Sequence, residues 1–131
     1  MANYADVEDL LVDWLKAKGW VNVVTEEPGN LHLVMPLLVV NRYGGGDDMI
    51  AIDKANVDID CYASTAVTAK AGIETVRRQV RTQLSGHAAS GAVVARVETI
   101  SGPTRLPYDS RSQVRRFGIS IRLTLHQYSG V

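Results

Sequence analysis

The sequence predicts an α+β protein in which an antiparallel or mixed β-sheet carries two α-helices on one face. Residues 6–18 and 64–84 repeat apolar side chains at helical spacing, while segments between and after them alternate apolar and polar residues as strands do. The order is a helix, several strands, a second helix and two strands. Hairpin-like connections of this kind favour antiparallel pairing, and no repeated βαβ alternation indicates a doubly wound fold.

Length and composition predict one folded domain that spans residues 1–131. The chain has 131 residues, of which 46% are hydrophobic and 21% are charged, a balance typical of globular proteins with a core of their own. Fourteen basic and fourteen acidic residues give a formal net charge of zero. This balance argues against a protein whose main task is to neutralise nucleic-acid phosphates.

The N-terminus and the single cysteine predict a soluble protein from a reducing compartment. The first residues include acidic side chains where a secretory signal carries basic ones, and no segment approaches the apolar length that spans a bilayer. Cys61 has no second cysteine to pair with and lies on the apolar side of a predicted strand. We therefore expect a small core residue rather than a nucleophile.

The first helix is predicted over residues 6–18. Asp6 is placed to cap its start, and Gly19 is placed to end it. A short strand is predicted after it, over Trp20–Val24. The apolar stripe of the helix follows i, i+3, i+4, i+7 and i+8 spacing, at Val7, Leu10, Leu11, Trp14 and Leu15.

A turn and two short strands are predicted next. Pro28 and Gly29 predict a turn over residues 26–30, because proline fixes the backbone and glycine frees it. Residues 31–35 predict a short strand. Leu37–Val40 is an apolar run suited to a strand that is buried on both faces.

A Gly- and Asp-rich stretch, Tyr43–Asp53, predicts a flexible surface loop. It leads into a strand in which Val57, Ile59 and Cys61 alternate with polar residues. No Lys-Ser or Lys-Thr follows the glycines, so the stretch is not predicted to be a phosphate loop. The loop residues of interest are Gly44, Gly45, Gly46, Asp47 and Asp48.

The second helix follows a cap at Ser64 or Thr65 and is weakened locally by Gly72. Its apolar face is predicted at Ala66, Ala69, Ile73, Val76, Val80 and Leu84.

Two further strands are predicted after a break of small residues at 86–91. The first covers Ala92–Ile100, with Val93, Ala95 and Val97 on one side and Val94, Arg96 and Ile100 on the other. A Pro/Gly loop is predicted over residues 101–113. The last strand is predicted from strict alternation of apolar residues, at Phe117, Ile119, Ile121, Leu123 and Leu125.

No catalytic, cofactor or metal site is predicted. The three histidines are scattered, and the sequence has no HExxH, GxSxG or paired CxxC motif. Five aspartates could gather around a hard cation, yet their spacing does not match a calcium loop. A metal-dependent hydrolase that uses Asp47, Asp48, Asp58 and Asp60 is a weaker alternative. The five aspartates are Asp47, Asp48, Asp53, Asp58 and Asp60.

Arginines form two groups in the second half of the chain. Like charges in a group most often mark a solvated face, but arginine is also enriched at subunit interfaces. A nucleic-acid-binding module would need them on one continuous surface. The helix group is Arg77, Arg78 and Arg81, and the C-terminal group is Arg105, Arg111, Arg115 and Arg116. A polar and aromatic contact surface is also considered on the other sheet face, at Tyr62, Arg122, Thr124 and Tyr128.

Several segments together resemble a known family. They are a helix that ends in Lys-Gly-Trp, the stretch PLLVVNRYGGGDD, the strand NVDIDCYA before an Ala-rich helix, the motif LPYD, and the terminal strand RRFGISIRLTLH. With these segments the chain resembles the tail terminator (tail completion) proteins of long-tailed bacteriophages, of the siphophage type found in phages of actinobacteria. The resemblance covers nearly the full chain.

The resemblance implies a structural subunit of the virion that is made in the cytoplasm of the host bacterium. Such subunits form a ring, usually a hexamer, on the head-proximal end of the tail tube, stop its polymerisation and present a joining surface to the head connector. Implied partners are other copies of the chain, the tail tube protein, the head-tail connector protein and genomic DNA that passes through the lumen without sequence-specific binding. No cofactor, membrane or enzymatic activity is implied. A head-tail connector or neck protein of the head side is the alternative.

Under this resemblance, candidate contact residues come from the Gly/Asp stretch, the LPYD motif and the arginines. The Gly/Asp stretch and LPYD are candidates for the lumen or for contacts with neighbouring subunits. The full set is Gly44, Gly45, Gly46, Asp47, Asp48, Arg77, Arg78, Arg81, Arg105, Tyr108, Arg111, Arg115 and Arg116.

Overall fold

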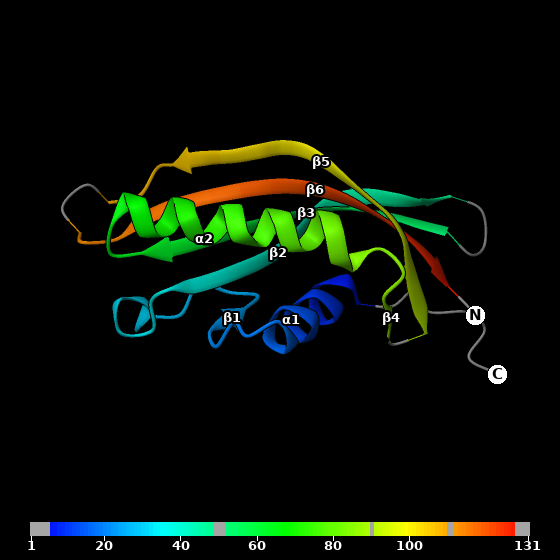
Figure 1. Ribbon diagram of the computed structural model, residues 1–131, viewed down its shortest axis with the longest axis horizontal. Coiled ribbons are helices and arrows are strands. Elements are labelled where there is room, and N and C mark those ends of the chain that lie inside the picture. The colour runs from blue at the N-terminus through cyan, green and yellow to red at the C-terminus, as the bar shows by residue number, and fades with distance from the viewer. Residues whose placement is uncertain (1–5, 49–51, 90, 110–111, 128–131) are drawn as a thin grey trace.

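Two helices lie on one face of a strongly curved, six-stranded mixed sheet, which confirms the predicted α+β class (Figure 1). The computed structural model describes residues 6–48, 52–89, 91–109 and 112–127. The sheet order is β1-β2-β3-β6-β5-β4, with β1 parallel to β2 and every other pair antiparallel. The elements are α1 (Val7–Ala17), β1 (Val23–Val24), the 3₁₀ helix η1 (Leu31–Leu33), β2 (Leu37–Asp48), β3 (Ile52–Ala63), α2 (Ala66–Gln79), the π-helical turn η2 (Val80–Leu84), β4 (Ala88–Ala89), β5 (Ala92–Leu106) and β6 (Arg115–Gln127).

The main core lies between the helices and the sheet. It joins the apolar stripe of α1 and that of α2 to the inward side chains of β2, β3, β5 and β6. Both helices therefore cover the same sheet face, as predicted. A smaller cluster on the other face is formed by Leu31, Leu37, Val39, Tyr62 and Val114.

The first helix confirms its predicted cap and stop. The Asp6 carboxylate accepts hydrogen bonds from the backbone N–H groups of Glu8 (3.0 Å) and Asp9 (3.2 Å). Gly19 follows the helix with φ of 105°, a conformation that glycine adopts without steric cost. The strand predicted over Trp20–Val24 is shorter than expected, because only β1 pairs with β2.

Residues 31–33 form a 3₁₀ helix, so the strand predicted over 31–35 is wrong. The N–H of Leu33 bonds to the carbonyl of Asn30 (2.8 Å) and that of Val34 to the carbonyl of Leu31 (3.1 Å). These local bonds use the backbone groups that a strand would offer to a neighbour. Leu31 is buried in the smaller cluster.

The Gly/Asp stretch is strand rather than loop through Asp48, which corrects the prediction. After a bulge between Arg42 and Gly44, residues 44–48 pair with β3 without a further register shift. Gly45 has φ of 94°, and a Cβ there would overlap the carbonyl of Lys54. Residues 49–51 lie outside the described residues.

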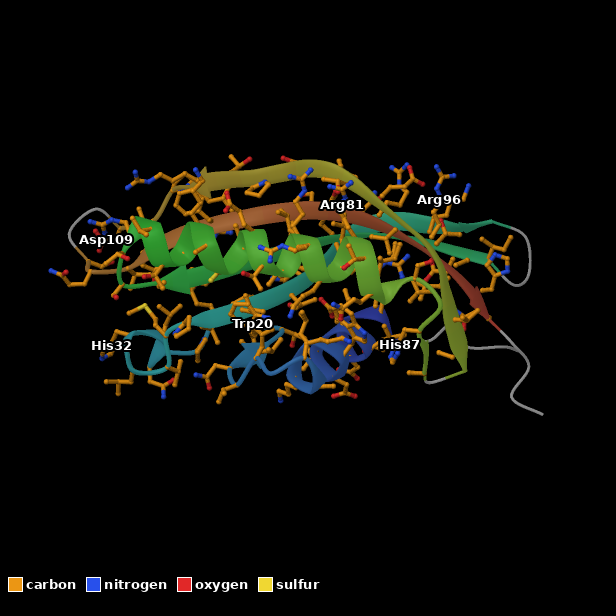
Figure 2. All side chains as sticks on the ribbon, viewed as in Figure 1. Trp20, His32, Arg81, His87, Arg96 and Asp109 are labelled. Atoms are coloured by element: carbon orange, nitrogen blue, oxygen red, sulfur yellow. The ribbon has the colours of Figure 1, made fainter. Side chains whose placement is uncertain are left out.

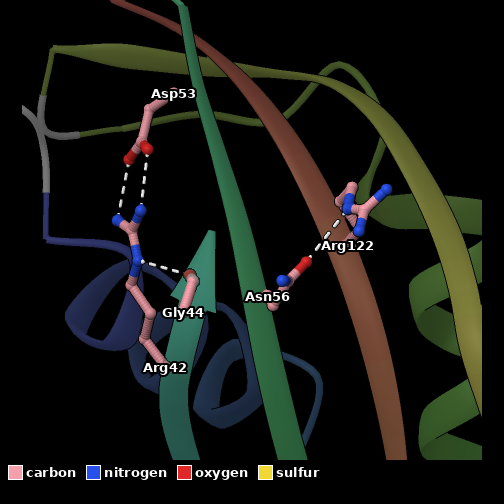
Figure 3. A network of polar contacts seen from close by, with 5 residues as sticks. All are labelled: Arg42, Gly44, Asp53, Asn56 and Arg122. Carbon is pink, nitrogen blue, oxygen red and sulfur yellow. Dashed lines mark hydrogen bonds and ion pairs between the residues drawn. The ribbon is translucent and has the colours of Figure 1, made fainter. Parts of the chain in front are cut away.

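An ion pair across β2 and β3 supports this extension of the hairpin (Figure 3). The Arg42 guanidinium donates two hydrogen bonds of 2.8 Å to the carboxylate of Asp53, whose side chain is buried. Its Nε also donates to the carbonyl of Gly44 (3.1 Å). Bidentate pairs of this kind fix both partners in one geometry, which stabilises a segment of low strand propensity.

The second helix begins at its predicted cap, since the Thr65 hydroxyl accepts the N–H of Thr68 (3.1 Å). Gly72 has a packing role that the prediction missed. A Cβ at this position would lie 2.8 Å from the Sγ of Cys61, so glycine allows α2 to approach β3 closely. Cys61 is a buried core residue, as predicted, and burial raises the pKa of its thiol to about 12.

The strand β5 runs to Leu106, so the loop predicted from residue 101 is wrong over residues 101–106. Three register shifts let it continue past Gly102 and Pro103. The first shift, between Val94 and Arg96, brings Val94 and Val97 to the same core, against the predicted alternation. The last strand, β6, has its apolar residues inward as predicted.

Candidate interaction surface

Charge is divided between the two halves of the chain. Residues 1–65 hold eleven of the fourteen acidic and four of the fourteen basic residues, a formal charge of −7, whereas residues 66–131 carry +7. In the sheet, β1, β2 and β3 form one half and β6, β5 and β4 form the other, and the two halves meet only where β3 pairs with β6. The molecule therefore has an acidic side with α1 and a basic side with α2 and β5 (Figure 1).

The basic side contains an open groove of ≈ 590 Å³ between α2 and β5. Four basic side chains line it, Lys70, Arg77, Arg78 and Arg81, which we name the α2 cluster. They share the groove with Glu74, Thr82 and Pro103.

The α2 cluster has no side-chain partners among the residues that the structure describes. Within the described part of the chain, none of its four side chains makes a hydrogen bond or an ion pair, and the Nε of Arg77 is buried without a hydrogen-bond partner. An unpartnered guanidinium atom in a desolvated position is costly. Figure 2 shows Arg81 on the side of α2 that borders the upper strands. The arrangement is suited to bind carboxylates or phosphates.

The C-terminal arginines surround a second pocket, of ≈ 250 Å³, at one end of the molecule. Arg105, Tyr108, Arg115 and Arg116 line it, and we name them the loop cluster. Asp109, labelled in Figure 2, marks this end. The structure thus brings together residues that the sequence placed in one group.

Most of the loop cluster is bound to its own chain. Arg116 donates to the Asp60 carboxylate at 2.6 and 3.1 Å and lies over the ring of Tyr62, 5.6 Å from its centroid. Arg115 donates to the backbone carbonyls of Ser112 (3.1 Å) and Val114 (3.0 Å). These two arginines hold β6 against β3 and against the residues just before β6. Because their donors are already used, they are less able than the α2 cluster to bind a partner molecule.

Tyr108 joins the same network. Its hydroxyl donates to the Glu27 carboxylate (2.9 Å), a bond that raises the pKa of Tyr108. Its ring meets the ring of Tyr62 edge to face, with centroids 5.7 Å apart. Burial raises the pKa of Tyr62 to about 12. The network ties the loop after β5 to the turn before η1.

Asp60 is the buried centre of the network, with 6% of its surface exposed. Burial raises the pKa of its carboxyl above the ordinary value, against the hydrogen bond from Arg116, which lowers it. Burial lowers the pKa of Arg116, but the hydrogen bond to Asp60 and the charge of Asp60 outweigh burial and raise the pKa of Arg116 above its ordinary value. Gly118 makes room for this pair, because a Cβ there would overlap Asp60 and lie 2.8 Å from the side chain of Leu106.

The polar and aromatic surface predicted on the second sheet face is only partly present. Tyr62 is buried, with 4% exposed, so its assignment to a contact surface is wrong. Arg122 is exposed and donates to the side chain of Asn56 (2.9 Å; Figure 3). Tyr128 lies outside the described residues, as does Arg111 of the C-terminal group.

Three of the five aspartates considered for a metal have partners of their own. Asp53 is held by Arg42, Asp60 by Arg116, and Asp58 accepts a short hydrogen bond from Ser120. Asp47 and Asp48 lie at the end of β2. Over residues 6–48, 52–89, 91–109 and 112–127, no group of three or more His, Cys, Asp or Glu side chains is placed to hold a metal ion.

The two loops that the resemblance implicates lie at opposite ends of the long axis. Gly44, Gly45 and Gly46 belong to the β2–β3 hairpin, which extends past the C-terminal end of α2 (Figure 1). Asp109, next to Tyr108 in the chain, lies at the other end (Figure 2). They cannot form one continuous site within a single copy.

The acidic side also carries residues that group-by-group inspection of the sequence missed. Asp9, Asp13 and Lys16 are exposed on the outer face of α1 and make no side-chain bond or ion pair with the described residues. The charge difference between the two halves of the sequence is the signal that points to them.

No protein-family model matches the chain, and no curated protein matches it. Among the described residues, no helix is long and apolar enough to span a bilayer.

Proposed function

We propose that the protein is a structural subunit that assembles head to tail into a closed ring, and that the ring is the terminator of a phage tail tube. The observation that carries the proposal is the separation of charge across the sheet. A surface that complements a different surface of an identical copy produces heterologous contacts, which close into rings when the rotation allows. The −7 and +7 halves of this chain supply such a pair of surfaces.

The resemblance supplies the identity of the ring. In that role, one face of the ring would contact the tail tube protein and the other the head connector, with DNA passing through the lumen. The β2–β3 hairpin and the loop at Tyr108 project from opposite ends of the subunit (Figure 1), so they are candidates for contacts along the tail axis or toward the lumen.

The proposal is tested by the mass of the protein in solution across a range of concentrations, measured by light scattering after size exclusion, alone and with the tail tube protein. We expect a closed oligomer near six subunits that caps tubes and limits their growth. A protein that remains monomeric in every condition, including with tubes present, contradicts the proposal. Capture by head-side connector proteins instead of tubes favours the connector alternative.

A further inference from the structure

We propose that the groove of the α2 cluster is the docking site for helix α1 of a second copy, with the two helices antiparallel. The inference rests on the proposed ring and names the surfaces that meet in it. Both surfaces present charged side chains that make no hydrogen bond or ion pair with the described residues of their own copy.

The pattern of charge on the two helices is complementary in reversed order. Along α2 and the π-helical turn η2 that continues it, Glu74, Arg77 and Arg81 follow i, i+3 and i+7 spacing and line one groove. Read backward along α1, the outer residues follow the same spacing with opposite sign: Lys16, Asp13 and Asp9. Residues at such spacing share a helix face and span about 10 Å along the axis. An antiparallel pair of helices therefore sets each charge against its opposite.

The position of the two helices suits a contact between copies rather than within one. In Figure 1, α1 lies along the lower border of the molecule and β5 along the upper one. The groove is lined by residues of α2, η2 and β5, so it lies away from α1. Each copy could give its α1 to one neighbour and its groove to another. Such a contact is heterologous, as a ring requires.

Glu74 favours a protein partner over nucleic acid in this groove. A phosphate backbone would meet a carboxylate among the arginines, which is repulsive, whereas Lys16 of a second α1 would pair with it. In the proposed contact, Arg77 and Arg81 pair with the two aspartates of α1, and Lys70 and Arg78 line the same groove and add positive charge to it. Arginine can hold a carboxylate through two hydrogen bonds, which also fixes register.

Cysteine cross-linking tests the register directly, because the single native cysteine, Cys61, is buried. One chain carries Asp9→Cys, and a second, isotopically labelled chain carries Arg81→Cys. We expect a disulfide between the two chains after mild oxidation at high protein concentration, identified by mass spectrometry. Lys16→Cys with Glu74→Cys should cross-link equally well. The mismatched pair Lys16→Cys with Arg81→Cys is the control and should cross-link at least about tenfold less, because its positions lie about 10 Å apart in the proposed register.

Charge reversal tests the energetics. Asp9→Lys with Asp13→Lys, or Arg77→Glu with Arg81→Glu, should weaken self-association about a hundredfold, since like charges then face each other. A chain with all four changes should associate again, because the signs are restored. Arg122→Glu, on the other sheet face, is the matched control and should leave association unchanged.

The outcomes separate this inference from the proposed function. A ring that persists through both double reversals, or equal cross-linking of matched and mismatched pairs, overturns the α1 docking site while the ring itself stands. Binding of a labelled oligonucleotide that is abolished by Arg77→Glu with Arg81→Glu, without any change in self-association, also overturns it and assigns the groove to phosphates. A chain that is monomeric with and without tubes removes the ring and the docking site together.

Discussion

The two clusters both contain three arginines, but the arginines differ in whether they are bonded to other residues of the chain. In the loop cluster, Arg116 is paired with a buried carboxylate and stacked on Tyr62, and Arg115 caps two backbone carbonyls. In the α2 cluster, four basic side chains line an open groove without a partner among the described residues. Residue type therefore does not decide whether an arginine supports the fold or a contact. The surrounding acceptors decide it.

The difference follows from what lies across the sheet. Arg116 is directly opposite Tyr62 in the β3–β6 register and reaches Asp60, two residues away on β3. The arginines of the α2 cluster line a groove with Pro103 of β5, and Arg77 lies near Gly102. The carboxylate of Glu74 lines the same groove but forms no ion pair with them among the described residues. Mutations in the loop cluster should therefore change mainly the folding stability, whereas mutations in the α2 cluster should change mainly the self-association of the protein.

The largest effect is expected from breaking the pair at Asp60. Asp60→Ala leaves the half-buried guanidinium of Arg116 without its carboxylate, so we expect the free energy of unfolding to fall by about 2–3 kcal/mol, reduced from the fully buried case because Arg116 keeps some solvent contact. Arg81→Ala should change it by less than about 0.5 kcal/mol, as for an exposed side chain without partners. Urea unfolding at low protein concentration measures both. Equal losses would remove the distinction between the clusters.

The fold was largely predictable where the signal is local. The spacing and caps of α1 and α2 and the alternation of β6 depend on neighbouring residues, and the structure confirms them. Prediction failed where a distant partner decides. Glycine and aspartate have low strand propensity, so the end of β2 resembles a loop until pairing with β3 and the Arg42–Asp53 bridge are known.

The candidate surface was predictable only as a list of residues. The sequence grouped the arginines correctly, yet it could not show that Asp60, 56 positions from Arg116, lies beside it. It also placed Tyr62 on an exposed surface, because strand alternation does not reveal that η1 and Val114 cover that part of the second face. Long-range pairing, which no local pattern encodes, separates the two clusters.

The second-largest expected effect is the weakening of self-association by salt. If the α2 cluster binds carboxylates of another copy, raising NaCl from about 0.05 M to about 0.5 M should weaken self-association about tenfold, since exposed charges are screened within a shorter distance. The pair of Arg116 and Asp60 is largely buried and should respond much less. Light scattering for association and urea unfolding for stability, in the same buffers, separate the two responses. Association that strengthens with salt would instead indicate an apolar interface.

A smaller effect is expected at the rim of the loop cluster. Tyr108→Phe removes the hydroxyl that donates to Glu27 and keeps the ring that packs on Tyr62. We expect a loss of about 0.5–1 kcal/mol in the free energy of unfolding, as for one partly exposed hydrogen bond. Tyr43→Phe is the matched control, because Tyr43 is exposed on β2. A loss of the same size in the control would show that the Glu27 bond contributes nothing.

The smallest expected effect is the pH dependence of folding stability, which should differ between the two clusters. The pKa of Asp60 in the folded protein is raised above its ordinary value of 3.8 by burial, so the folded state holds a proton more tightly than the unfolded chain does. The stability that this proton contributes is fully present below about pH 3.8 and is lost as pH rises through the folded pKa. The stability of the native protein relative to Asp60→Asn should therefore fall as pH rises above about 3.8 and through the raised pKa of Asp60.

The opposite slope would mean that pairing with Arg116 outweighs burial at Asp60 and that the folded pKa is depressed. The stability of Arg81→Gln relative to the native protein should stay constant over the same range, because the Arg81 side chain makes no hydrogen bond or ion pair with a titrating group among the described residues. Parallel pH series of urea unfolding for the three proteins measure both slopes. A flat series for Asp60→Asn together with a sloping one for Arg81→Gln would reverse the roles assigned to the two clusters, since it would place the titrating partner at α2.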